Sequence, residues 1–112
     1  MRVAAVVSDL LIGSRILDVA TRAGAELVRV DSPADLPPAD DLDLVLIDWG
    51  GRSPNWGEQL RAWVAAAPSS PRIVLFGPHT DLAAHADAKR HRLGPMLARS
   101  KLITSLPSLF GG

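Results

Sequence analysis

The chain of 112 residues carries twelve basic and twelve acidic side chains and no cysteine. Its length suits one domain, so we expect residues 1–112 to form a single one. The balanced charge gives no reason to expect binding to nucleic acid or an anionic membrane surface, and the lack of cysteine excludes disulfides, thiolate catalysis and cysteine metal sites. No stretch resembles a signal peptide or reaches the length of a membrane span, so we expect a cytoplasmic globular domain.

Five short, mostly apolar segments are predicted to be strands: 3–7, 26–30, 44–47, 71–76 and 95–98. The segment 44–47 is apolar at every position and is followed by Asp48, as expected of a central strand that is buried on both faces of a parallel sheet. The segment 26–30 alternates polar and apolar residues, which is typical of a strand near a sheet edge.

Helical patterns lie between and after these strands, and we predict helices over 15–23, 54–67, 80–93 and 102–110. Gly24 suits the position that ends the first helix, and Thr80 is a good N-cap for the third. Three prolines between the second and third strands leave room for a single turn around 34–36. Pro107 is expected to shorten or split the last helix.

The third predicted helix has a thin apolar stripe of Leu82, Ala86 and Leu93, so we expect it to be the most exposed. Strands that alternate with helices predict a parallel sheet joined by right-handed crossovers. The expected fold is a flavodoxin-like, doubly wound α/β domain with strand order 2-1-3-4-5 and with shortened second and fifth helices.

Several features of the sequence resemble the receiver domain of bacterial response regulators. Asp9 follows the first strand, Asp48 ends the third, a P-x-I-V-L pattern spans 71–75 and a G-x-x-L pattern spans 94–97. The similarity covers nearly the whole chain. It implies a role in signal transduction by a two-component system, with Asp48 at the position that accepts the phosphoryl group.

The chain departs from the receiver pattern where the chemistry occurs. The resemblance implies adjacent acids for magnesium, but the chain has Ser8 and Asp9, which leaves Asp9 and Asp48 as a weak Mg²⁺ site. The family's hydroxyl residue is replaced by Phe76 and its lysine by Arg99. Each missing donor removes part of the stabilisation of a transferred phosphoryl group. We expect Arg99 to pair with Asp48 or Asp9 and to hold the site in one state.

The carboxyl ends of the strands are expected to surround a pocket lined by Ser8, Asp9, Asp48, Trp49, Phe76, Gly77, His79 and Arg99. Trp49 is a candidate gate or contact surface, although burial is at least as plausible. Trp56 and Trp63 are expected to pack in the core. The spacing of His79, His85 and His91 does not place them on one helical face, so it predicts no metal site.

We therefore predict a degenerate, pseudo-receiver module that is not an enzyme, needs no cofactor and binds a protein partner or a second copy. Its expected interface combines Lys89, Arg90, Arg92, Leu102, Leu106 and Leu109. Two alternatives stay open. One is a working receiver in which Asp48 is phosphorylated by a histidine kinase with Mg²⁺. The other is a small-molecule sensor that uses the pocket at the carboxyl end of the sheet.

Overall fold

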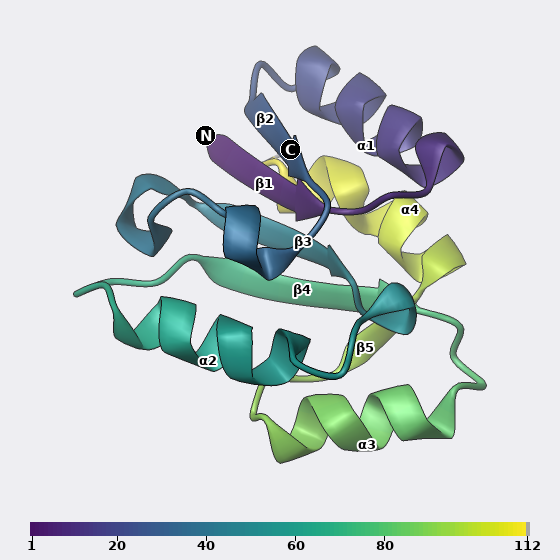
Figure 1. Ribbon diagram of the computed structural model, residues 1–112. Coiled ribbons are helices and arrows are strands. Elements are labelled where there is room, and N and C mark those ends of the chain that lie inside the picture. Colours follow the sequence, from purple (N-terminus) through teal and green to yellow (C-terminus); the bar gives the residue numbers. More distant parts are fainter. Residues whose placement is uncertain (112) are drawn as a thin grey trace.

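The computed structural model describes residues 1–111. Five parallel strands form one sheet in the order β2-β1-β3-β4-β5, which confirms the predicted topology (Figure 1). The central strand β3 pairs with β1 on one side and β4 on the other. The strand bounds are β1 Arg2–Val6, β2 Glu26–Val30, β3 Leu44–Asp48, β4 Arg72–Gly77 and β5 Met96–Ala98.

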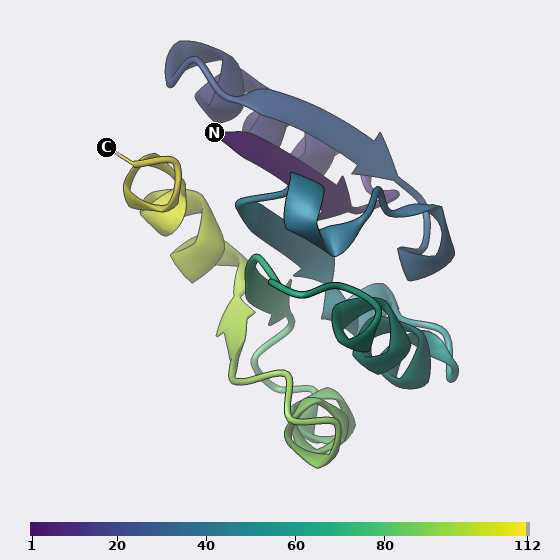
Figure 2. The same cartoon turned by 90° about the vertical axis from the view of Figure 1, so that its left-hand side faces the viewer.

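Four α-helices and three short 3₁₀ turns connect the strands: α1 Leu10–Arg22, η1 Pro33–Asp35, η2 Ala39–Asp41, η3 Trp49–Gly51, α2 Trp56–Ala65, α3 Leu82–Arg90 and α4 Arg99–Leu109. Helices α1 and α4 cover one face of the sheet, and α2 and α3 cover the other (Figures 1 and 2). No helix in residues 1–111 has the length and apolarity to cross a membrane.

Strand β3 divides its side chains between the two cores. All five of its residues are buried; Leu44 and Leu46 face α1 and α4, while Val45 and Ile47 face α2 and α3. Burial of one such aliphatic side chain contributes about 1.5–3 kcal/mol. The strand is therefore fixed from both sides, and its last residue, Asp48, is held at the carboxyl edge.

Two aspartates begin helices, and both helices start at other residues than predicted. Asp9 is the N-cap of α1, where its carboxylate accepts two backbone N–H groups of the first turn at 2.9 and 3.2 Å, so α1 begins five residues earlier than expected. Asp81, and not Thr80, caps α3 by accepting the N–H of Ala84 at 3.0 Å. Gly24 has a φ of +72°, as predicted for the residue that ends the first helix.

No α-helix forms between β2 and β3. The prolines predicted a single turn around 34–36; η1 matches it to within one residue, and η2 is a second turn that was not predicted. Pro107 does not split the last helix, because α4 runs for 11 residues through Pro107 and ends at Leu109. Proline removes one backbone donor near the end of the helix, and the buried side chains of Leu102, Leu106 and Phe110 hold the last turns against the sheet.

The predicted apolar stripe of α3 is wrong in its first two members. Leu82 is 77% exposed and Ala86 is also exposed. The buried face of α3 consists of Ala84 and Ala88, and Leu93 is buried just after the helix. An earlier helix end and a backbone φ of +57° at Arg92 explain how the chain turns Leu93 inward.

Candidate functional site

Asp48 is the buried acidic residue at the carboxyl end of the sheet. It is the last residue of β3, lies on the same face as Leu44 and Leu46, and is 7% exposed. Its Oδ1 atom is buried and has no hydrogen-bond partner among the described residues. A carboxylate oxygen in this state is costly unless a charge or a ligand compensates it.

The surroundings of Asp48 raise the pKa of its carboxyl above the ordinary value of 3.8. Burial is the largest cause, and the negative charge of Asp9 adds to it. Arg99 and the backbone N–H of Gly51 lower the pKa in part. The Nη2 atom of Arg99 lies 4.0 Å from Oδ1, at the outer limit of an ion pair, and the Arg99 side chain is 45% exposed. The expected pairing of Arg99 with Asp48 is therefore present only in a weak form.

The carboxylate of Asp9 caps the first turn of α1, the helix that follows it. Its Oδ1 atom accepts the N–H groups of Leu11 and Ile12, which uses one carboxylate oxygen as a cap. Magnesium is normally held by several carboxylate and other oxygens in near-octahedral geometry. Here two acids are available, one of them caps α1, and a guanidinium lies beside the other. Within residues 1–111 no group of three or more histidines and acids could hold a metal, so these residues fit Mg²⁺ poorly.

Phe76 is the direct neighbour of Asp48 in the strand register and is fully buried. Its ring belongs to the same core face as Asp48, so the position beside the carboxylate has no side-chain donor. Ser8 and His79 are exposed, and the main contact of His79 is a 3.0 Å bond between its backbone carbonyl and the His85 ring. Four surface cavities are lined by other residues, and the pocket at the carboxyl end of the sheet stays a prediction.

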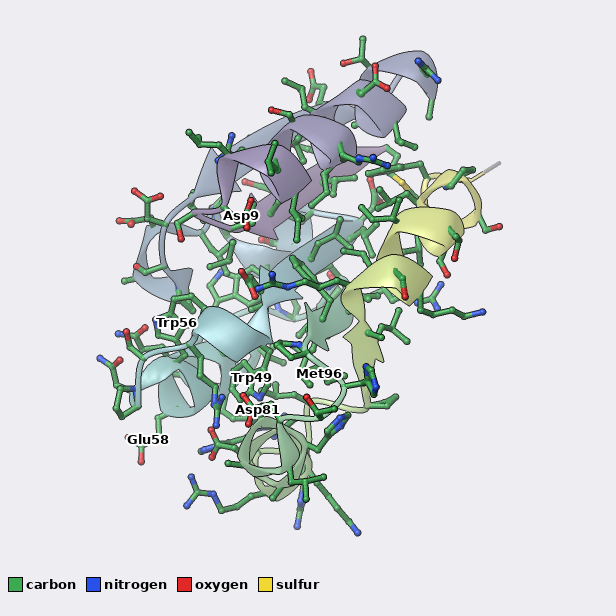
Figure 3. The ribbon with its side chains drawn as sticks, turned by 90° about the vertical axis from the view of Figure 1, so that its right-hand side faces the viewer. Asp9, Trp49, Trp56, Glu58, Asp81 and Met96 are labelled. Atoms are coloured by element: carbon green, nitrogen blue, oxygen red, sulfur yellow. The ribbon has the colours of Figure 1, made fainter. Side chains whose placement is uncertain are left out.

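Trp49 is fully buried, which confirms the second of its two predicted roles and leaves the first, a gate or contact surface, without support. Its indole Nε1–H donates to the carbonyl of Ala84 on α3 at 2.9 Å. Figure 3 shows Trp49 between the turn after β3 and helix α3, while Asp9 lies at the start of α1. Trp56 is buried as expected, and the half-buried Trp63 donates its Nε1–H to the carbonyl of Pro37 at 2.8 Å.

The structure exposes the basic residues of the predicted interface but buries two of its three leucines. The three basic residues are exposed, and a surface groove of about 530 Å³ is lined by His85, Lys89, Arg92, Gly94 and Pro95. The apolar half of the prediction is wrong for Leu102 and Leu106, which are fully buried because they anchor α4 to the sheet. Leu109 is partly buried against the same core.

A polar cluster that the sequence did not reveal joins η3 to α3. The Nε of Arg52 donates to Oδ2 of Asp87 at 2.8 Å, and Arg90 donates to the other carboxylate oxygen. The hydrogen bond from Arg52 is the main reason that the pKa of Asp87 is lowered. Arg52 and Asp87 are 35 residues apart in the sequence, so no spacing pattern could have paired them.

Solved structures share the fold of this chain. No family model and no curated protein matches the sequence. Among solved structures, a response regulator from Hahella chejuensis is similar over 98% of this chain and 92% of its own, with 17% identity and a TM-score of 0.71. A response regulator receiver protein from Burkholderia phymatum has 16% identity, coverage of 98% and 94%, and a TM-score of 0.67. A receiver domain protein from Clostridium thermocellum has 14% identity, the same coverage and a TM-score of 0.65.

Proposed function

We propose that this chain is a receiver-like signalling domain that works by binding another protein and that Asp48 takes no phosphoryl group in its working cycle. The receiver fold and the place of Asp48 at the end of β3 support a role in two-component signalling. The proposal that Asp48 takes no phosphoryl group depends on the environment of this residue, which has Phe76 beside it and the Arg99 guanidinium 4.0 Å away.

Phosphorylation of Asp48 would be poorly stabilised in this environment. A phosphoryl group adds negative charge and three oxygen acceptors, and its transfer depends on donors that are already in position. Phe76 offers no donor, Asp9 adds repulsion, and the guanidinium of Arg99 is 4.0 Å away and partly solvated.

The partner surface in this proposal is the α3 basic face, which consists of His85, Lys89 and Arg92 around the groove of about 530 Å³. No acidic residue lines this groove. A two-fold dimer through the same face would bring these basic residues against their own copies, which like-charge repulsion disfavours. An acidic surface on a different protein is the complementary partner.

Intact-mass spectrometry after incubation with Mg²⁺ and a small phosphodonor tests the proposal. We expect no phosphoryl adduct on protein that circular dichroism shows to be folded. A single adduct that disappears in Asp48→Asn would overturn the proposal and establish a working receiver. The specific observation that favours this second function is that Oδ1 of Asp48 has no hydrogen-bond partner among the described residues, so no protein donor has to be displaced before it reacts.

Sedimentation velocity tests the choice of partner. A monomer is expected at low salt, where like-charge repulsion across the α3 basic face is strongest. A dimer at low salt that persists in Lys89→Glu would place self-association on another surface. A dimer that is lost in Lys89→Glu would show that the α3 basic face binds a second copy.

A further inference from the structure

Asp48 and Trp49 are consecutive residues whose side chains enter opposite faces of the sheet. Asp48 lies on the face of α1 and α4, where Arg99 begins α4. Trp49 belongs to the core under α2 and α3 and is fully buried. The peptide between these two residues therefore connects the carboxylate to the opposite layer of the fold.

The first link from this peptide to α3 is the indole of Trp49. Its Nε1–H donates to the carbonyl of Ala84 at 2.9 Å in a buried environment. Ala84 is itself fully buried in the first turn of α3. A displacement of Trp49 must either break this hydrogen bond or carry the start of α3 with it.

The second link is the guanidinium of Arg52, which follows η3 directly. It donates to Asp87 at 2.8 Å and to the carbonyl of Trp49 at 3.3 Å, and it stacks over the Trp49 ring at 5.3 Å from the centroid. Both members of the Arg52–Asp87 pair have side chains that are 17% exposed, so the pair is shielded from most screening by solvent. Trp49 and Arg52 thus hold α3 at two successive turns.

The carboxylate of Asp48 constrains the same turn from the other side. A Cβ built on Gly51 would lie 3.6 Å from Oδ2 and 3.7 Å from Cγ of Asp48, so the carboxylate packs directly against the Gly51 backbone. The preceding residue, Gly50, packs so tightly that a Cβ there would lie 2.6 Å from Cδ of Pro78. The turn has little room to move unless its neighbours move as well.

We infer that Asp48 positions α3 through η3, with Trp49 and Arg52 as the two connections. Each step is a contact between adjacent groups: carboxylate to Gly51, the turn to Trp49 and Arg52, and these to Ala84 and Asp87. Phe76 has no group for a polar link along β4, so this route bypasses that strand. The inference goes beyond the proposed function, because it makes the position of the α3 basic face depend on the side chain of Asp48.

Amide hydrogen exchange of the full chain tests this route without a phosphodonor or Mg²⁺. Asp48→Ala removes the carboxylate, and we expect the amides of α3 to exchange about three- to tenfold faster, as for the loss of one packing contact in a coupled series. Asp48→Asn keeps an oxygen toward Gly51 and should leave α3 closer to wild type. In a Trp49→Phe, Arg52→Gln background, Asp48→Ala should add no further acceleration in α3.

Trp63→Phe is the matched control, because it removes the same kind of indole bond, to Pro37 at 2.8 Å, away from α3. In that background Asp48→Ala should keep its full effect on α3. If the double background is too unstable to measure, Arg52→Gln alone should reduce the effect of Asp48→Ala. An equal effect of Asp48→Ala in all backgrounds, or no effect on α3, would overturn the inference. A phosphoryl adduct on Asp48 would overturn the proposed function and leave this route standing.

Discussion

The core under α1 and α4 consists of aliphatic side chains and both phenylalanines, whereas the core under α2 and α3 adds tryptophans and a shielded ion pair to its aliphatic residues. On the first face, α1 and α4 bury Ile16, Leu102 and Leu106 against the strands. On the second face, Trp49 and Trp63 each donate an indole N–H to a backbone carbonyl.

The difference follows from what each helix can bury. Helix α4 presents large aliphatic side chains, so apolar area alone fixes it to the sheet. Helix α3 buries only Ala84 and Ala88, and the helix expected between β2 and β3 is replaced by turns. Specific polar bonds from neighbouring elements make up for the small apolar area, and they also define where α3 lies.

Trp49→Ala should be the most damaging change to the α3 side. It removes a fully buried indole together with the bond to Ala84, and we expect a loss of about 3–5 kcal/mol in the free energy of unfolding, measured in urea. Leu106→Ala is the counterpart on the other face, at about 2–5 kcal/mol. If Trp49→Ala cost less than 1 kcal/mol, the tryptophan would not be what holds this face together.

Gly57→Ala should destabilise the contact between α2 and the end of α3. A Cβ at Gly57 would lie 2.6 Å from Cγ of His91, so the whole ring must shift, at a cost of about 1–3 kcal/mol. His91→Ala in the same chain should recover most of the loss, since it removes the clash. Urea unfolding of both variants measures the effect, and a persistent loss in the double variant would contradict the close packing.

Arg52→Gln should cost about 1–2 kcal/mol, because it breaks a shielded pair with Asp87. Arg22→Gln is the matched control: the Arg22–Asp18 pair on α1 is exposed and should contribute less than about 0.5 kcal/mol. Asp87 has a lowered pKa, so its stabilisation is present above the unfolded value of 3.8 and disappears as pH falls through the folded pKa. The wild-type and Arg52→Gln stabilities should therefore converge in acid; a constant gap down to low pH would contradict the ion pair.

Asp48→Asn should have the smallest effect and the opposite sign, a gain of about 1 kcal/mol at neutral pH, because it removes a buried charge with weak compensation. The pKa of Asp48 is raised, so the wild type loses stability as pH rises from 3.8 through the folded pKa. The gain should appear only above that window, in urea unfolding across pH 3 to 8. Destabilisation at neutral pH would show that Arg99 compensates the charge fully.

The strands and the sheet order could be predicted because each depends on a local pattern. Runs of apolar residues predicted β1, β3 and β4, and alternating polar and apolar residues predicted β2. The prolines between β2 and β3 predicted that no full helix forms there. The starts of α1 and α3 were predicted less well. Asp9 caps α1 and Asp81 caps α3, and each lies beside other residues at which a helix could begin. The stripe of α3 was misplaced because small alanines and an exposed leucine give a weak pattern.

The candidate site was predicted in part. The sequence alone placed Asp48 at the carboxyl end of a central strand, with Phe76 and Arg99 as departures from the receiver pattern, because strand position and residue type are local properties. Only the tertiary structure decided that Trp49 is buried, that Leu102 and Leu106 are core, and that Arg52 meets Asp87 across 35 residues. Those outcomes depend on which helix packs on which face, and no local pattern encodes that choice.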